Sequence, residues 1–278
     1  MCGIIGYTGP LMARDVILQG LHQLEYRGYD SAGMALLTDD GGMYLRKKVG
    51  QVSALEAVCE PEIPAHCGIG HTRWATHGGV TDANAHPHAV GKVVLLHNGL
   101  IENYHTISRQ FGFEGLATSE TDTEVAAQLI NYYYEQTGDP YEAIRRSIEI
   151  IEGSYAFCIL FEDIPGTIYA IRNVSPLVAA TTPDEGSFIA SDVTALIAYT
   201  KEYFAVPEQH ILTITRDQIR METLEGTVVE PEMLEVTWDV EAAQKGGYPH
   251  FMLKEIHEQP EVFQKTVLPR LRDGLPNF

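Results

Sequence analysis

The chain starts with Met1-Cys2-Gly3-Ile4-Ile5-Gly6, and this stretch carries the first functional hypothesis. If Met1 is removed, Cys2 becomes the terminal residue and carries both a thiol and a free α-amine. The thiol has a reference pKa of about 8.5 and the amine one of about 7.7 to 8.0, so the amine can act as a base near neutral pH. Nucleophile and base would then share one residue, with a water bridging them. The alternative is a buried, inert cysteine at the start of a strand.

Composition restricts the class of protein. The 278 residues are 45% hydrophobic and 21% charged, which is typical of a globular chain with one large domain or two modest ones. A formal net charge of −19 disfavours nucleic acid and anionic membranes and favours a small-molecule partner. The four cysteines show no metal or disulfide spacing, and no signal peptide or membrane span is recognisable. We therefore expect a reduced, cytoplasmic protein without a cofactor.

Strand and helix patterns favour an α+β architecture. Strands are expected over 3–7, 32–37 and 43–47, and a helix after the first strand ends near Arg27 and Gly28. Helices are also expected after Thr121 and Asp139, which stand as N-terminal caps. Further strands are expected over 155–161, 167–171, 177–180, 187–190 and 209–215. The order along the chain, strands followed by helices and then by strands again, fits an α+β layer architecture better than a series of alternating βαβ units.

Residues 68–88 are polar and glycine-rich, and they are predicted to form a long surface loop after a short strand. Arg73 offers a planar fork for a carboxylate, and Trp74 offers a flat wall beside it. Thr76 and His77 add hydrogen-bonding groups, so the loop could be a lid that captures an amino-acid carboxylate. A solvated loop around a packed tryptophan fits the composition equally well.

Two further positions each have a structural and a functional interpretation. Asn98-Gly99 follows an apolar strand, which indicates either a type I′ turn or two donors aimed at one oxyanion. Asp122 begins the helix that Thr121 caps, so it either compensates the helix dipole or binds a substrate ammonium.

Five histidines fall close together in the sequence: His71, His77, His86, His88 and His97. Such clustering can indicate a metal site, but no HExxH motif, paired cysteine or nearby acid stands at a ligand spacing. We therefore expect no metal.

The last part of the chain changes character. Residues 217–241 contain eight acids and one arginine, and 244–247 resemble a linker, so a domain boundary is expected near residue 240. Residues 250–270 have a helical pattern that Pro260 and Pro269 interrupt.

Six sequence motifs follow one another along the chain: Met-Cys-Gly-Ile, Leu-Glu-Tyr-Arg-Gly-Tyr-Asp-Ser-Ala-Gly, His-Thr-Arg-Trp-Ala-Thr-His-Gly, Asn-Ala-His-Pro-His, His-Asn-Gly and Ser-Glu-Thr-Asp-Thr-Glu. Together they closely resemble the glutaminase domain of the glutamine:fructose-6-phosphate aminotransferases, which are class II glutamine amidotransferases. Residues 251–260 look like the entry to the sugar-isomerase part of that family.

The resemblance implies a fold and a domain division. The fold would be a four-layer αββα sandwich of two antiparallel sheets, of the Ntn-hydrolase type. Residues 1–238 would form the glutaminase domain, and residues 239–278 would be a linker and the truncated start of the sugar-isomerase domain.

The resemblance also implies roles for individual residues. Cys2 would attack the glutamine carboxamide, and Asn98 with the Gly99 N–H would hold the oxyanion. Arg73 would bind the substrate carboxylate and Asp122 its ammonium. The remaining implied or expected site residues are Trp74, Thr76 and His77 in a closing loop, and Arg27, Gly28, His71 and His86 as supports.

The implied partner is L-glutamine, with fructose 6-phosphate used only through the missing isomerase domain. The full-length protein would be a homo-oligomer without nucleic-acid or membrane partners. Two alternatives stay open: a non-catalytic domain that senses glutamine, and a chain that is inert because Met1 is retained.

Overall fold

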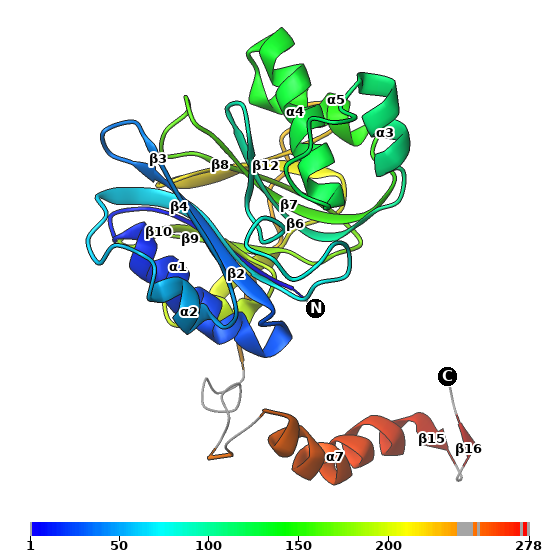
Figure 1. Cartoon of the computed structure of the whole chain (residues 1–278). Coiled ribbons are helices and arrows are strands. Elements are labelled where there is room, and N and C mark those ends of the chain that lie inside the picture. Colours follow the sequence, from blue (N-terminus) through cyan, green and yellow to red (C-terminus); the bar gives the residue numbers. More distant parts are fainter. Residues whose placement is uncertain (1, 238–246, 249–250, 273–274, 277–278) are drawn as a thin grey trace. The chain divides into compact units, whose positions relative to one another are not determined.

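The computed structural model describes residues 2–237, 247–248, 251–272 and 275–276. Two compact units divide the chain, Met1–Val236 and Thr237–Phe278. Both Met1 and the predicted boundary near residue 240 lie outside the described residues. The first unit contains two sheets and five α-helices among its described residues (Figure 1).

The first sheet has eight strands, and its ladders are antiparallel. In spatial order they are β14 (Leu234–Glu235), β11 (Glu202–Ala205), β9 (Val178–Thr182), β10 (Gly186–Ala190), β1 (Gly3–Thr8), β4 (Ala65–Arg73), β2 (Ser31–Thr38) and β3 (Met43–Val49). The strands expected over 32–37 and 43–47 are confirmed, and they form the antiparallel β2–β3 pair. Because β1 is an inner strand, the N-terminal stretch is held on both sides by other strands.

The second sheet has six strands and is also antiparallel. In spatial order they are β13 (Gln218–Thr223), β12 (His210–Thr215), β8 (Ile168–Asn173), β7 (Gly153–Phe161), β6 (Val93–Ile101) and β5 (His88–Val90). The inner strands β7 and β8 are largely buried, because this sheet is covered on both faces.

Helices cover the outer face of each sheet (Figure 1). The first sheet carries α1 (Ala13–Leu24) and α2 (Val52–Glu56), and the second carries α3 (Tyr104–Phe111), α4 (Asp122–Thr137) and α5 (Pro140–Ile148). Three apolar clusters fill the layers: one between the sheets around Ile4 and Leu96, one under α1 around Ile17, and one under α4 around Leu129. This is the predicted αββα sandwich, and the prediction is confirmed.

Both predicted helix caps are confirmed. The Thr121 hydroxyl accepts from the backbone N–H of Glu124 at 3.3 Å, and Asp139 accepts from the N–H groups of Tyr141 and Glu142. The Glu124 carboxylate reaches back to the backbone N–H groups of Thr118 and Ser119 instead of completing a capping box with Thr121.

The loop predicted over residues 68–88 begins later than expected. Gly68 to Arg73 continue β4 in the middle of the first sheet, so this part of the prediction is wrong. The glycines that indicated a loop are needed for close packing of α1, because a Cβ on Gly68 or Gly70 would collide with Ile17.

The type I′ turn considered at Asn98-Gly99 is also absent from the structure. Both residues continue β6, where they pair with Ala156 and Tyr155 of β7. Gly99 has φ +141°, and a Cβ there would collide with the carbonyl of Ser154. The Asn-Gly signal therefore reflects a tight backbone contact within a strand.

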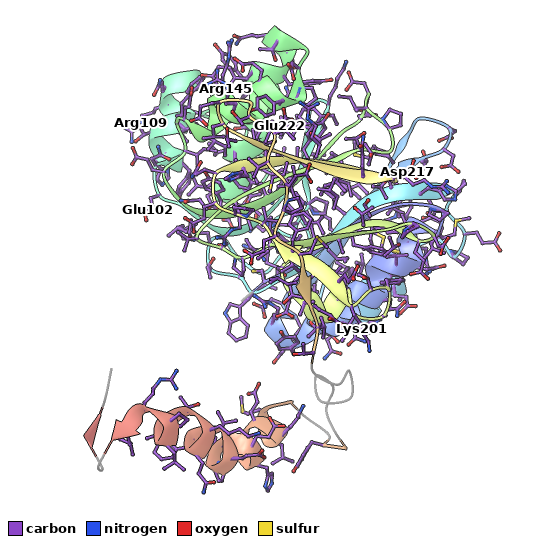
Figure 2. The ribbon with its side chains drawn as sticks, turned by 180° about the vertical axis from the view of Figure 1, so that it is seen from behind. Glu102, Arg109, Arg145, Lys201, Asp217 and Glu222 are labelled. Atoms are coloured by element: carbon purple, nitrogen blue, oxygen red, sulfur yellow. The ribbon has the colours of Figure 1, made fainter. Side chains whose placement is uncertain are left out.

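The second unit contains α7 (Phe251–Val267), the 3₁₀ helix η3 (Leu268–Arg270), and β15 (Leu271–Arg272) paired with β16 (Leu275–Pro276). The expected interruption at Pro260 is wrong, because α7 continues through it at the cost of one backbone donor. None of the helices in the described part of the chain combines the length and apolar character that a membrane crossing requires. Charged side chains such as Arg109 and Asp217 lie at the surface of the first unit (Figure 2).

Candidate active site

Cys2 lies directly before β1, whose first residue pairs with Thr72 of β4. Its Sγ accepts a hydrogen bond from the Trp74 backbone N–H at 3.2 Å and lies 3.5 Å from the Trp74 carbonyl. The half-buried thiol therefore faces the end of β4 and the loop that follows. Met1 is not among the described residues, so its removal stays a prediction.

Arg27 holds the backbone of Cys2. Its Nε donates to the Cys2 carbonyl at 3.1 Å, and its Nη1 pairs with Asp192 at 2.9 Å. The 3₁₀ turn η1 (Glu25–Arg27) brings this side chain back from the end of α1. Gly28 packs against the loop, where a Cβ would lie 3.0 Å from the Cβ of Trp74. Arg27 thus lies beside the candidate nucleophile, and Gly28 lies beside the loop that the nucleophile faces.

Asn98 projects from β6 toward the same point. Its Nδ2 donates to the Cys2 carbonyl at 3.2 Å, and its Oδ1 lies 2.9 Å from Nε2 of the buried His71. The Cys2 carbonyl oxygen and Asn98 Oδ1 can only accept hydrogen bonds. Asn98 must therefore turn its Nδ2 to Cys2, and His71 must donate from Nε2 to Asn98 Oδ1. His71 Nδ1 is then the bare nitrogen, which agrees with its having no partner among the described residues. His71 therefore orients the Asn98 donor.

Arg73 and Asp122 lie on opposite elements of the site. Arg73 ends β4 and is only 4% exposed, and its guanidinium donates to the carbonyls of Gly79, at 3.1 Å, and of His77. These bonds use two of its five N–H groups. Asp122 begins α4 and accepts from the Ile101 backbone N–H at 2.8 Å.

A narrow cavity of about 30 Å³ connects these groups. It is lined by Cys2, Arg73, Trp74, Thr76, His77, His86, His97, Gly99, Thr121, Asp122 and Thr123. Four predicted site residues stand behind this lining: Asn98, Arg27, His71 and Gly28. The structure therefore brings all of the predicted site residues into one region, although their assigned roles stay predictions.

Burial sets the ionisation of the site. It raises the pKa of the Cys2 thiol, while the Trp74 N–H and the positive charges of Arg73 and Arg27 oppose this less strongly. Near neutral pH the thiol is therefore protonated and needs a base before it can attack a carbonyl. The α-amine released by removal of Met1 would supply that base.

Four buried imidazoles surround the cavity: His71, His86, His88 and His97. Ring centroids of His71 and His86 lie 4.4 Å apart, and those of His86 and His88 lie 5.0 Å apart. Burial lowers the pKa of His71 and of His88 to about 3, and it also lowers those of His86 and His97. Asp122, 3.9 Å from His97, opposes this shift, but burial outweighs it, so His97 is neutral.

These imidazoles predict a loss of stability in acid. Each pKa falls on folding, so the unfolded chain binds more protons between its ordinary pKa of 6.5 and the folded value. The free energy of unfolding should therefore be constant above about pH 7 and fall below it, by up to about 1.4 kcal/mol per pH unit for each imidazole. Urea unfolding between pH 8 and pH 5 measures this slope.

The variant His88→Gln cannot take up a proton but can still bond to Thr121. The slope of its unfolding free energy against pH should therefore be smaller by the uptake of about one proton. The exposed His22 is the matched control, and His22→Gln should keep the full slope. A stability that does not change between pH 7 and pH 5 in the wild-type chain would contradict the prediction.

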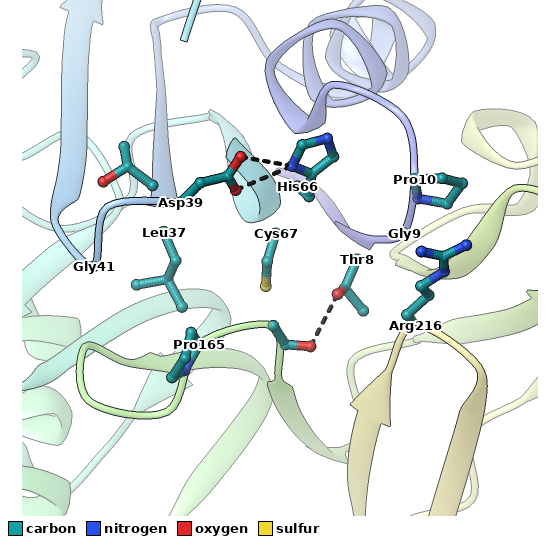
Figure 3. Close-up of a pocket in the computed structure, with 12 residues that line it drawn as sticks. Thr8, Gly9, Pro10, Leu37, Asp39, Gly41, His66, Cys67, Pro165 and Arg216 are labelled. Atoms are coloured by element: carbon teal, nitrogen blue, oxygen red, sulfur yellow. Dashed lines mark hydrogen bonds and ion pairs between the residues drawn. The ribbon is translucent and has the colours of Figure 1, made fainter. Parts of the chain in front are cut away.

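A second cavity, of about 590 Å³, lies at the other end of β1 (Figure 3). It contains the His66–Asp39 pair at 3.0 Å and the Thr8 hydroxyl, which donates to the Gly166 carbonyl at 2.9 Å. The Cys67 thiol also lines it, but burial raises its pKa to about 12, so this thiol is unreactive. Because a strand rises about 3.3 Å per residue, the length of β1 places this cavity roughly 20 Å from Cys2.

The described residues contain no group of three or more histidine, cysteine, aspartate or glutamate side chains arranged to hold a metal ion. Three of the buried histidines, His71, His88 and His97, bond instead to Asn98, Thr121 and Thr123, respectively.

Sequence reasoning missed several residues that hold this region together. Asp192 pairs with Arg27, Ser191 accepts from the Ile4 N–H at 2.9 Å, and Glu120, together with Asn84 of the loop after β4, bonds to Gly79. Asp192 and Ser191 follow β10, which is remote in sequence from every motif, so only the pairing of β10 with β1 could reveal them.

Comparisons with known proteins agree with this geometry. A family model described as a glutamine amidotransferase domain matches residues 71–198. The chain is 47% identical over 277 residues to an isomerizing glutamine–fructose-6-phosphate aminotransferase of Thermus thermophilus, covering 98% of this chain and 45% of that protein. It is 44% identical over 275 residues to the enzyme of the same name from Caldanaerobacter subterraneus, with the same coverage. The chain thus spans about half the length of the curated relatives it matches.

A solved structure shares the fold. The glutamine phosphoribosylpyrophosphate amidotransferase of B. subtilis, complexed with ADP and GMP, superposes with a TM-score of 0.69 at 25% identity, covering 82% of this chain and 50% of that chain. Fold and family match together define a glutamine amidotransferase of the Ntn-hydrolase type. Within that class, the chain belongs to the family of isomerizing glutamine–fructose-6-phosphate aminotransferases, as their glutaminase part.

Proposed function

We propose that this chain hydrolyses L-glutamine to L-glutamate and ammonia, with Cys2 as the nucleophile once Met1 is removed. The observation that carries the proposal is the meeting of Cys2, Asn98, Arg73 and Asp122 around one cavity, although they come from four separate parts of the chain. A nucleophile, an oxyanion donor and a pair of groups for an amino acid are the parts that glutamine hydrolysis requires.

The first step forms a thioester. The Cys2 α-amine, through a bridging water, takes the thiol proton as Sγ attacks the carboxamide carbon of glutamine. The tetrahedral oxyanion is held by Asn98 Nδ2 and the Gly99 N–H. The C–N bond then breaks, and the nitrogen leaves as ammonia with the proton that the amine returns.

The second step releases glutamate. Water attacks the thioester carbon while the same amine accepts its proton, and a second tetrahedral oxyanion forms in the same place. The C–S bond breaks, the thiol recovers its proton, and the enzyme is ready for the next glutamine.

Glutamine is recognised through its charged ends. The Arg73 guanidinium keeps donors for the α-carboxylate, and the buried Asp122 offers an oxygen to the α-ammonium. Trp74, Thr76 and His77 would close over the substrate, because the cavity is too narrow to admit glutamine unless this loop opens first.

Arg73→Ala is predicted to weaken glutamine binding more than it slows the chemistry. Loss of a charge-assisted pair costs about 1.5 to 3 kcal/mol, so KM should rise about 10- to 100-fold, with a much smaller change in kcat. Arg73→Lys keeps the charge but loses the planar fork, so its KM should lie between that of the wild type and that of Arg73→Ala. Steady-state kinetics measures the split, and unchanged glutamine affinity in Arg73→Ala would exclude Arg73 from the site.

The direct test is hydrolysis by this chain with a free Cys2. Glutamate and ammonia should appear in equal amounts, and intact mass should show that Met1 is gone. Binding of glutamine without hydrolysis would instead indicate a glutamine-sensing domain.

We further propose that the full-length protein uses the ammonia to convert fructose 6-phosphate to glucosamine 6-phosphate. The curated relatives, which are aminotransferases of this kind, support the proposal. Residues 1–238 would be the glutaminase domain, and residues 239–278 the linker and the start of the sugar-isomerase domain. With fructose 6-phosphate and glutamine, the full-length protein should form glucosamine 6-phosphate, whereas this chain should form only glutamate and ammonia.

The proposal also covers the location, the partners and the oligomeric state of the protein. Free cysteines support a reduced, cytoplasmic location, and the net charge of −19 supports the lack of a nucleic-acid or anionic-membrane partner. The full-length protein is proposed to be a homo-oligomer, which its mass in solution would test.

A further inference from the structure

The loop after β4 is held at two points. Near its start, the Ala75 backbone N–H donates to the Asp30 carboxylate at 2.9 Å. At Gly79, the backbone N–H donates to Glu120, and the carbonyl accepts from Arg73 and from Asn84, which lies later in the same loop. Thr76 and His77 lie between these two points, and both line the cavity.

The second point is a pair of side chains, Asn84 and Glu120, which we call the loop anchor. A Glu120 carboxylate oxygen accepts from the Gly79 N–H at 3.0 Å and from Asn84 Nδ2 at 2.8 Å. Asn84 Nδ2 also donates to the Gly79 carbonyl at 3.0 Å, and Asn84 Oδ1 accepts from the Glu120 N–H at 2.9 Å. The Gly79 and Asn84 donors lower the pKa of Glu120, so its carboxylate is charged and these bonds are charge-assisted.

The loop anchor is connected directly to Arg73. The same Gly79 carbonyl that Asn84 holds also accepts from Arg73 Nη1 at 3.1 Å. Gly78 turns the chain against the anchor with φ +73°, and a Cβ there would lie 2.9 Å from Asn84 Nδ2. The position of the Gly79 carbonyl therefore depends on the anchor, and the guanidinium of Arg73 depends on that carbonyl.

The loop anchor also touches the opposite side of the site. Glu120 immediately precedes Thr121, the N-cap of α4, and Asp122 is the first residue of that helix. One short segment thus holds the proposed ammonium-binding carboxylate and, two residues earlier, the carboxylate that fixes the loop above Arg73. Its bonds set the spacing between the two charged recognition groups.

We infer that Asn84 and Glu120 are positioning residues that hold the closed loop and orient Arg73 toward the α-carboxylate of the substrate, and so determine selectivity for a free amino acid. The inference rests on the proposed glutamine hydrolysis and deepens it. Neither residue needs to touch the substrate.

The test compares L-glutamine with its α-methyl ester, which keeps the carboxamide and ammonium but lacks the carboxylate charge. In Glu120→Ala and in Asn84→Ala, the KM for glutamine should rise about 10-fold, with kcat changed less than about threefold. The kcat/KM for the ester should change less than about twofold, because the ester makes no ion pair with Arg73. Selectivity for the free acid should therefore fall about 10-fold.

Two variants serve as controls. Glu120→Gln keeps one acceptor oxygen without the charge, so it should recover part of the lost selectivity. Glu114→Ala removes a highly exposed glutamate from the same connecting segment and should behave as the wild type.

An equal loss of kcat/KM for both substrates would overturn the inference, because it would mean that the anchor only supports the fold. An unchanged KM for glutamine in both alanine variants would overturn it as well. If the wild-type chain binds glutamine without hydrolysing it, the proposed function fails separately, and calorimetric affinities then decide. About 10-fold weaker glutamine binding in Glu120→Ala and Asn84→Ala would support the positioning role of the loop anchor, and binding equal to that of the wild type would refute it.

Discussion

Cys2→Ala is expected to abolish glutamine hydrolysis, with a fall in kcat of at least about 10⁴-fold. The Cys2 thiol lies where the Asn98 amide, the end of β4 and the start of α4 meet. No thioester can form without it, and water alone would have to attack a carboxamide. The other cysteines, Cys59, Cys67 and Cys158, cannot substitute, since none of them lines this cavity.

Glutamate release at saturating glutamine measures this effect, with intact mass recorded on the same samples. Cys59→Ala is the matched control, because Cys59 is a partly buried cysteine packed in the layer under α1, away from the cavity. It should hydrolyse glutamine at the wild-type rate. Activity of Cys2→Ala within about 10-fold of the wild type would exclude the thioester mechanism. Wild-type protein that retains Met1 should also be inactive, because the base is then missing.

Asn98→Ala is expected to lower kcat about 10²- to 10³-fold while KM changes little. The Asn98 amide donates to the Cys2 carbonyl at 3.2 Å in the substrate-free site, which places its nitrogen beside the residue that carries the reacting sulfur. An oxyanion exists only in the tetrahedral state, so a donor aimed at it stabilises the transition state much more than bound glutamine. The buried His71 keeps that donor correctly turned.

The isosteric variant Asn98→Asp separates donation from packing. It keeps the shape of the side chain but replaces the donor with a negative charge, so its kcat should fall at least as far as in Asn98→Ala. His71→Ala should lower kcat in the same direction by a smaller factor, because Asn98 remains present but is less well oriented. A rise in KM with unchanged kcat in Asn98→Ala would contradict the oxyanion role.

Elements with strong local signals could be predicted from the sequence. Thr121 and Asp139 cap helices because a short polar side chain can satisfy exposed backbone N–H groups wherever a helix begins. The β2–β3 hairpin follows from two strands joined by a short glycine turn. Strands without strong patterns, such as β11 and β13, were not predicted, since each is stabilised by its neighbours in a sheet.

Predictions from glycines were wrong where tertiary packing, and not a turn or loop, requires the glycine. Gly68 and Gly70 indicated a loop, but they allow α1 to approach β4. Gly99 indicated a turn, but it allows β6 to pass the Ser154 carbonyl. A glycine marks either a backbone conformation or a close neighbour, and the sequence alone does not distinguish the two.

By itself, the sequence determined the antiparallel α+β class, the family resemblance and the set of residues that could act, because these depend on local patterns and on residue chemistry. The tertiary structure alone decided how those residues work together. His71 orients Asn98, Asp192 holds Arg27, and the loop anchor reaches Gly79, in each case through contacts between residues distant in sequence. Such contacts arise only when β1, β4, β6 and α4 pack together, since each buried polar group must then find a partner across the layers.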